Sequence, residues 1–191
     1  PTSDLMHFPP MLKQLKRGPQ VILPKDIGMI LAFTGVGKES SCIDAGSGSG
    51  FLAISLGNIA KEVTSYERNG QFSLLASENL KRSGLKNVKI VQADIFEGIE
   101  EEGAELYTLD MAESDKAVPL AHKALAAGGF LVGYLPHAEQ AQKFVSACRA
   151  AGFSETFVLE SIVREYLARE QGFRPENTGL THTAYLVFSR K

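Results

Sequence analysis

The sequence lacks the features of membrane-spanning and secreted proteins. It contains no apolar run of membrane-spanning length, and its first residues lack the basic start, apolar middle and small-residue cleavage site of a signal peptide. With 191 residues, 44% of them hydrophobic, the chain suits one domain with a substantial core. We therefore expect a cytoplasmic globular protein.

Cysteine and histidine are also scarce. The two cysteines, Cys42 and Cys148, lie in a predicted strand and on the apolar face of a predicted helix, without metal-ligand spacing. The four histidines cluster neither with the cysteines nor with each other. We expect two buried thiols and no metal site.

Neither sign of charge is in large excess. Twenty basic residues against 22 acidic ones give a formal net charge of −2, with an isoelectric point near 6.1. This balance does not indicate a nucleic-acid-binding protein as a whole, although a local patch or a groove between subunits can still be basic.

What is present is a strict alternation of strand and helix patterns. The pattern predicts strands at 41–45, 62–66, 88–92, 106–109, 129–135, 157–163 and 184–188, and helices at 26–33, 50–60, 70–82, around 118–125, and at 138–151. Such alternation favours an α/β fold with a mostly parallel sheet and helices on both faces. The last two strands have no helix between them, so they can pair as an antiparallel hairpin at one edge.

The N-terminal part of the chain shows less order. Residues 1–17 carry two adjacent prolines and little periodicity, so we expect an arm or the remnant of a linker. The first helix is expected to begin with Asp26 as its N-cap and to stop at Gly35.

A glycine-rich loop at 44–50, with the sequence DAGSGSG, separates the first alternating strand from its helix. Glycines at a strand-to-helix turn leave bare backbone amides where a ligand can approach closely. A dinucleotide fingerprint starting at Gly46 needs glycine or alanine where Phe51 stands, which disfavours NAD. The acid-x-G-x-G-x-G pattern instead resembles the first motif of class I S-adenosylmethionine-dependent methyltransferases, and the alternative is an ordinary glycine-rich turn.

Acidic residues end the first four strands of this alternation. In an open α/β sheet, ligands bind at the carboxyl ends of the strands. Glu67 lies about twenty residues beyond the glycine loop, a distance at which a carboxylate reaches the ribose hydroxyls of a nucleoside. The alternative is a surface glutamate beside Arg68. The acids are Asp44, Glu67, Asp94 and Asp110.

The third and fourth of these acids have predicted roles nearer the base and the methyl group. Asp94 can accept a hydrogen bond from an adenine amino group while Ile95 or Phe96 packs on the ring, or it can be a simple loop acid. Asp110 can hold the ammonium group of the cofactor, accept from the amino group of the acceptor, or act as general base. Its alternative is a strand-end acid that binds only the cofactor.

Several segments together resemble the tRNA adenine-N1 methyltransferases of archaea and bacteria. The matching segments are 17–26 (RGPQVILPKD), the glycine loop, 64–67 (TSYE), 128–136 (GGFLVGYLP), 139–140, 174–176 (RPE) and 182–188 (HTAYLVF). This resemblance implies methylation of adenosine 58 in the tRNA T-loop, in archaea sometimes also of adenosine 57. It also implies a Rossmann-like class I methyltransferase domain at 18–191 with a seven-stranded sheet.

The resemblance assigns roles to further residues. It implies that S-adenosylmethionine is the cofactor, that tRNA is the substrate and that the protein is a homotetramer. Catalysis is assigned to Asp110 and substrate binding to Tyr134, Arg174 and His182. The cofactor-binding set is Gln20, Asp44, Gly46, Ser47, Gly48, Ser49, Gly50, Glu67, Arg68, Asp94, Ile95 and Asp110.

Two departures from the family pattern leave alternatives open. Only residues 1–16 stand where the family has a small N-terminal β domain, so the chain is a fragment or binds its substrate in another way. The stretch after Asp110 lacks the family's proline. The alternatives are a small-molecule methyltransferase of the decarboxylating precorrin type, a protein isoaspartate methyltransferase, and an inactive cofactor-binding partner subunit.

Two kinds of side chain are further candidates for RNA contacts. A target adenine with its N1 exposed must be unpaired, and Tyr134 and Phe8 are candidates to stack on it, although a core role suits each of them as well. Basic residues that include Lys25 and Arg174 are potential phosphate contacts, although most such residues are simply solvated.

Overall fold

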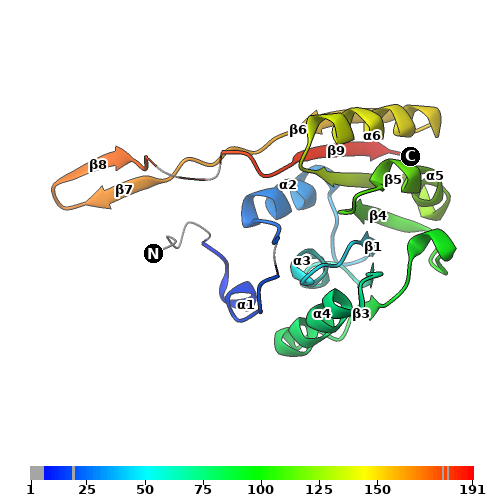
Figure 1. The fold of residues 1–191 in the computed structure, drawn as a ribbon, viewed down its shortest axis with the longest axis horizontal. Helices are drawn as coiled ribbons and strands as arrows, with labels where there is room; N and C mark the ends of the chain where they lie inside the picture. Colours follow the sequence, from blue (N-terminus) through cyan, green and yellow to red (C-terminus); the bar gives the residue numbers. More distant parts are fainter. Residues whose placement is uncertain (1–6, 19, 178, 180) are drawn as a thin grey trace.

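The fold is a seven-stranded sheet covered by helices on both faces (Figure 1). The computed structural model describes residues 7–18, 20–177, 179 and 181–191. The strand order is β3-β2-β1-β4-β5-β9-β6. The strands are β1 Ser41–Ala45, β2 Glu62–Tyr66, β3 Val88–Val91, β4 Ala104–Leu109, β5 Leu125–Leu135, β6 Glu155–Leu159 and β9 Tyr185–Arg190.

Two apolar clusters, one on each side of the sheet, form the core. One cluster includes buried side chains of α2 and α3, and the other those of α5 and α6. The helices are α1 Pro10–Lys13, α2 Pro24–Thr34, α3 Phe51–Gly57, α4 Gly70–Ser83, α5 Ser114–Ala124 and α6 Ala138–Ala150, with a short 3-10 turn, η1, at Ile95–Glu97. None of the described helices has the length and apolar character needed to span a bilayer. Both cysteines are buried, as expected.

The pairing of the central strands determines where a ligand can bind. β1 pairs in parallel with β2 on one side and with β4 on the other. The chain therefore turns in opposite directions from β1, and the carboxyl ends of β1 and β4 bound a crevice at the switch point, where open α/β sheets bind ligands. Strands β1 and β2 have the bounds that their sequence pattern predicts.

The fold class is confirmed, and the last two predicted strands, β6 and β9, pair antiparallel at one edge of the sheet as expected. The expected C-terminal edge strand is wrong in one respect: β9 also pairs antiparallel with β5, so β6 rather than β9 is the edge strand. The connection between these last strands contains a hairpin that periodicity did not predict. It consists of β7 Tyr166–Arg169 and β8 Gly172–Pro175, and it extends away from the sheet (Figure 1).

The start of α2 also differs. The expected stop at Gly35 is confirmed by its left-handed backbone, with φ of 67°. The expected N-cap is wrong, because Leu23 occupies the N-cap position and Pro24 the first helical turn. Asp26 lies inside the first turn with its side chain fully buried. Proline is well suited to this first turn because its fixed φ is helical and no amide partner is lost.

The described part of the N-terminal segment packs on the domain. Residues 1–6 of the expected arm lie outside the described residues. Beyond them, Phe8, Leu12 and Leu15 are buried in the same apolar cluster as α2 and α3. The Phe8 ring meets the Phe51 ring edge-on at 5.4 Å. Phe8 thus has a core position in this structure.

Candidate active site

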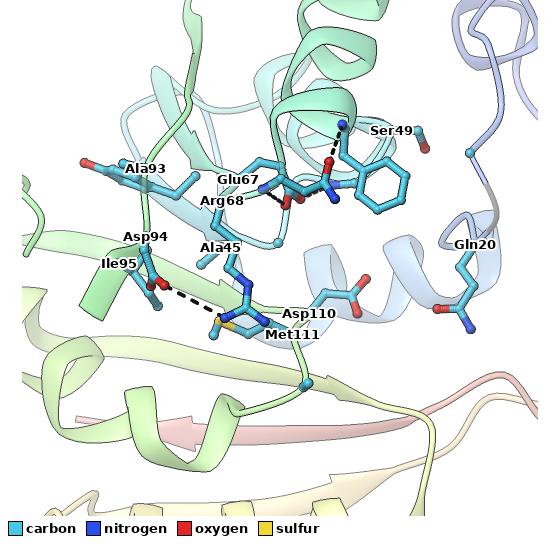
Figure 2. Close-up of a pocket in the computed structure, with 17 residues that line it drawn as sticks. Gln20, Ala45, Ser49, Glu67, Arg68, Ala93, Asp94, Ile95, Asp110 and Met111 are labelled. Atoms are coloured by element: carbon cyan, nitrogen blue, oxygen red, sulfur yellow. Dashed lines mark hydrogen bonds and ion pairs between the residues drawn. The ribbon is translucent and has the colours of Figure 1, made fainter. Parts of the chain in front are cut away.

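A cavity of about 400 Å³ opens at the carboxyl ends of β1 to β4. Glycine-loop residues form one wall, and the segments after β2, β3 and β4 form the others (Figure 2). The lining residues are Gly18, Gln20, Ala45, Gly46, Gly48, Ser49, Tyr66, Glu67, Arg68, Asn69, Phe72, Ala93, Asp94, Ile95, Asp110, Met111 and Ala112.

The glycine loop lies directly against the end of β4. Gly46 has φ of 94°, and its amide donates to the carbonyl oxygen of Tyr66 at 2.9 Å. A Cβ atom at Gly46 would lie 2.0 Å from the carbonyl oxygen of Asp110. Only glycine fits such a close approach of two backbones with a positive φ. The loop therefore brings β1 and Asp110 together at the cavity.

Asp44 lies beneath the loop and supports it. Its side chain is buried and accepts hydrogen bonds from Ser65 Oγ at 2.6 Å and Thr108 Oγ1 at 2.7 Å. These bonds join β1 to both of its neighbours. Burial raises the pKa of Asp44. Asp44 does not line the cavity, and neither do two other predicted cofactor residues, Ser47 and Gly50.

Glu67, which follows β2, binds the glycine loop directly. Its carboxylate accepts the amide of Gly48 at 2.9 Å and the amide of Asn69 at 2.9 Å. Each carboxylate oxygen can accept more than one hydrogen bond. Glu67 lines the cavity (Figure 2), so remaining acceptor capacity is available there for a diol.

Asp94 caps a turn at the cavity. It accepts the amide of Phe96 at 3.0 Å and so caps η1, and it also lines the cavity beside Ile95. The Arg68 guanidinium lies 3.8 Å from the Asp94 carboxylate. Phe96 does not line the cavity, and its side chain is 41% exposed.

Asp110 faces the cavity at the end of β4 (Figure 2). Asp110 is exposed to the cavity. Partial desolvation by the surrounding cavity walls, together with the negative charges of Asp44 and Glu67, raises the pKa of Asp110 to about 7. A carboxylate that titrates near neutral pH is suited to accept a proton or to stabilise a developing positive charge.

The three predicted substrate residues lie outside this cavity. Tyr134 is half-buried on β5, the strand beside β4, with its hydroxyl 3.5 Å from Asp26 Oδ2. Both ring nitrogens of His182 have partners, with Nδ1 2.6 Å from Glu160 Oε1 and Nε2 2.9 Å from the carbonyl oxygen of Pro136. Arg174 lies on β8 of the protruding hairpin (Figure 1). The structure does not bring these three side chains together.

Asn79 is a supporting residue that sequence reasoning missed. It is fully buried on α4. Its side chain accepts the amide of Lys16 at 2.8 Å and donates to the carbonyl oxygens of Lys16 and Ser49, each at 2.8 Å. Asn79 thus joins the N-terminal segment to the glycine loop. The available signal was an asparagine on the apolar face of a helix, spaced from Phe72 and Ala76.

The lining residues fit S-adenosylmethionine. Carboxylates suit its ribose hydroxyls, amino groups and positive charges, and Phe72, Ile95 and Met111 offer apolar surface for a purine. Arg68 is the basic side chain among the described lining residues. Within the described part of the chain, no group of three or more His, Cys, Asp or Glu side chains is arranged to hold a metal ion.

The sheet order and the carboxylate-lined glycine-loop cavity define a class I S-adenosylmethionine-dependent methyltransferase. A family model described as tRNA methyltransferase complex GCD14 subunit matches residues 7–184, and the chain belongs to this family.

Named relatives agree with this family. A tRNA (adenine(57)-N(1)/adenine(58)-N(1))-methyltransferase of Methanocaldococcus jannaschii is 31% identical, with 94% of this chain and 74% of that protein covered. A tRNA (adenine(58)-N(1))-methyltransferase of Thermus thermophilus is also 31% identical, with 94% and 72% covered. The crystal structure of a tRNA (m1A58) methyltransferase from Aquifex aeolicus superposes with a TM-score of 0.88 at 34% identity, covering 94% of this chain and 73% of that one.

Proposed function

We propose that this protein transfers a methyl group from S-adenosylmethionine to N1 of adenosine 58 in the T-loop of tRNA. Adenosine 57 is a second target position, because the Methanocaldococcus relative is named for both. The observation that carries the proposal is the Asp110 carboxylate at the end of β4, on the boundary between the cofactor cavity and the neighbouring strand β5. The family match over residues 7–184 favours tRNA over the isoaspartate and precorrin alternatives.

The cofactor would be held by the residues that line the cavity. Glu67 is placed to accept from the ribose hydroxyls, and Asp94 and Ile95 lie where an adenine ring would be bound. When bound, S-adenosylmethionine supplies a methyl group that its positive sulfur already activates. The reaction therefore needs no metal in this proposal.

Asp110 acts on the acceptor. Its carboxylate accepts a hydrogen bond from the exocyclic amino group of the target adenine, and this bond strengthens as positive charge develops on the ring. The N1 atom lies on the Watson–Crick edge, so the target base must be unpaired or flipped out. The pKa of about 7 keeps Asp110 able to take up a proton from the methylated base near neutral pH.

The test is methyl incorporation into tRNA transcripts with adenosine or guanosine at position 58. We expect incorporation only with adenosine, and the Asp110→Asn variant should lose about 10²–10⁴-fold in kcat because the amide cannot accept a proton. Asp115→Asn, a charge change outside the cavity, serves as the control. Full activity of Asp110→Asn would overturn its role, and cofactor binding without turnover on any tRNA would favour an inactive partner subunit.

The quaternary structure and the compartment are part of the proposal. We propose a cytoplasmic homotetramer, in which several subunits form the tRNA-binding groove. The exposed apolar side chains Tyr166 and Phe173 on the β7–β8 hairpin support this, because an interface between copies would cover them.

A further inference from the structure

Lys25 and Asp26 form a buried ion pair at the start of α2, outside the cofactor cavity. Lys25 Nζ lies 2.7 Å from Asp26 Oδ1, and the two side chains are 10% and 0% exposed. Lys25, considered above as a phosphate contact, therefore has its ammonium turned inward. Removing two charges from water is costly, so such a pair is tolerated only where further hydrogen bonds satisfy it.

The further hydrogen bonds reach the base of the β7–β8 hairpin. Lys25 Nζ also donates to the carbonyl oxygen of Ser161 at 2.6 Å and to Thr183 Oγ1 at 2.7 Å. Thr183 Oγ1 in turn donates to Asp26 Oδ2 at 2.8 Å. Ser161 precedes the hairpin and Thr183 follows it. The ion pair therefore binds both legs of the hairpin, that is, the two chain segments that connect it to the sheet.

The same carboxylate also reaches Tyr134. The Tyr134 hydroxyl lies 3.5 Å from Asp26 Oδ2. Burial raises the pKa of Tyr134, and the negative charges of Asp26 and Asp110 contribute in the same direction. Tyr134 follows Gly133, the register partner of Leu109, so it lies on the neighbouring strand at the level of Asp110.

The strand order places the partners of the ion pair beside the cofactor cavity. The cofactor cavity lies at the ends of β3, β2, β1 and β4, and β5 and β9 continue the sheet beyond Asp110. A methyl acceptor that reaches Asp110 without occupying the cofactor cavity must approach from the β5 side. The residues that Lys25 and Asp26 hold, namely Ser161, Thr183 and Tyr134, belong to that side.

We infer that Lys25 and Asp26 are a positioning pair for the methyl acceptor. They fix Tyr134 and both legs of the hairpin as the acceptor-side wall next to Asp110, and they act on the reaction through that wall. This inference rests on the proposed function for the identity of the acceptor. It gives the segment PKD at 24–26 a role that is separate from cofactor binding.

The central variant is Asp26→Asn, which keeps the shape of the side chain and removes its charge. We expect kcat/KM for tRNA to fall about 10- to 100-fold, as misplacement of a reacting group does. The Kd for S-adenosylmethionine should stay within about twofold, because the pair does not touch the cavity. Thr183→Val keeps both charges of the ion pair and removes the hydroxyl that bonds each of them to one leg of the hairpin. It should also lower kcat/KM for tRNA without changing the Kd for S-adenosylmethionine, with a smaller loss than Asp26→Asn.

A matched control separates positioning from loss of stability. Asn87 donates to the carbonyl oxygens of Gly57 and Ala60, at the opposite end of the sheet from the site. Asn87→Ala should lower Tm while leaving kcat/KM unchanged at temperatures well below Tm. If Asp26→Asn keeps full activity, or loses cofactor affinity in proportion to activity, the inference is wrong.

A double-mutant cycle tests whether the pair acts through Tyr134. Asp26→Asn should cost less in the Tyr134→Phe background than in the wild type, because the hydroxyl that it positions is already absent. Fully additive losses would contradict this route. A wild-type protein that methylates no tRNA would instead refute the proposed function, so the two failures are distinguishable.

Discussion

At the scale of single residues, the acidic side chains of this site differ in what surrounds them. Asp44 is buried under two hydroxyl donors and joins strands. Glu67 shares its carboxylate between two backbone amides and the cavity. Among the described residues, no hydrogen-bond donor to the Asp110 carboxylate offsets its desolvation and the nearby negative charges, so its pKa rises to about 7. Environment thus gives three equivalent sequence features three different roles.

The raised pKa of Asp110 predicts pH-dependent cofactor binding. Below pH 7 the carboxyl group is mainly protonated and neutral, and above pH 7 it is mainly ionised. Because S-adenosylmethionine carries positive charge, its affinity should increase as the pH rises from about 6 to about 8, which isothermal titration calorimetry can measure. Asp110→Asn should bind with a flatter pH profile, whereas Asp115→Asn should keep the wild-type profile. An unchanged slope in Asp110→Asn would contradict this assignment.

At the scale of elements, the close contact between the β1–α3 loop and the end of β4 shapes the cavity. That contact depends on backbones meeting at Gly46 and Asp110 rather than on side chains. Asn79 adds a second tie, from α4 to the loop and to the N-terminal segment. The shape of the cavity therefore depends on the packing of the glycine loop against β4 and α4.

Gly46→Ala should disrupt the loop. The new Cβ would lie 2.0 Å from the Asp110 carbonyl oxygen, at a residue with φ of 94°. The backbone strain alone costs of order 1–3 kcal/mol, which corresponds to a fall in Tm of roughly 2–12 °C for a domain of this size. Thermal unfolding monitored by circular dichroism, with cofactor titration, measures both effects.

The matched control is Gly28→Ala on α2, where a Cβ meets nothing within 4 Å. Alanine is the better helix former by about 0.5–1 kcal/mol, so this variant should be as stable as the wild type or more stable. Equal stability and cofactor affinity in Gly46→Ala and Gly28→Ala would show that the close approach is unimportant.

At the scale of the whole molecule, the β7–β8 hairpin is the feature that packing within one chain does not explain. It extends from the sheet (Figure 1), and its Tyr166 and Phe173 rings stack on each other at 5.3 Å while remaining 50% and 73% exposed. The two legs at its base are held by Lys25. A second copy of the chain is the partner we propose for these aromatic side chains.

Multi-angle light scattering tests the proposed tetramer. We expect a mass near four times that of the 20.7 kDa chain, because an interface between copies would remove the exposed aromatic side chains from water. Tyr166→Ser with Phe173→Ser should shift the mass downward. A monomeric mass for the wild type at micromolar concentration would refute the proposal.

Much of the fold was predictable because its signals are local. β1 and β2 are short segments flanked by glycine or charged residues, and their bounds are as predicted. The glycine loop and the acids at strand ends predicted a cofactor corner, and Glu67, Asp94 and Asp110 all line one cavity. The buried position of Asp44 beneath the loop was not predicted, because the sequence does not show whether an acid at a strand end faces the cavity or the core.

The sequence by itself determined the class of fold, the family and the acids that border the cofactor cavity, because periodicity and motif spacing depend on neighbours along the chain. The tertiary structure alone decided that β9 lies between β5 and β6, that Asn79 joins two walls of the cavity, and that Asp26 meets Thr183 across 157 residues. Such contacts depend on which elements pack together. The glycine loop and the acids at the strand ends could therefore be predicted from the sequence, whereas the acceptor-side wall next to Asp110 required the tertiary structure.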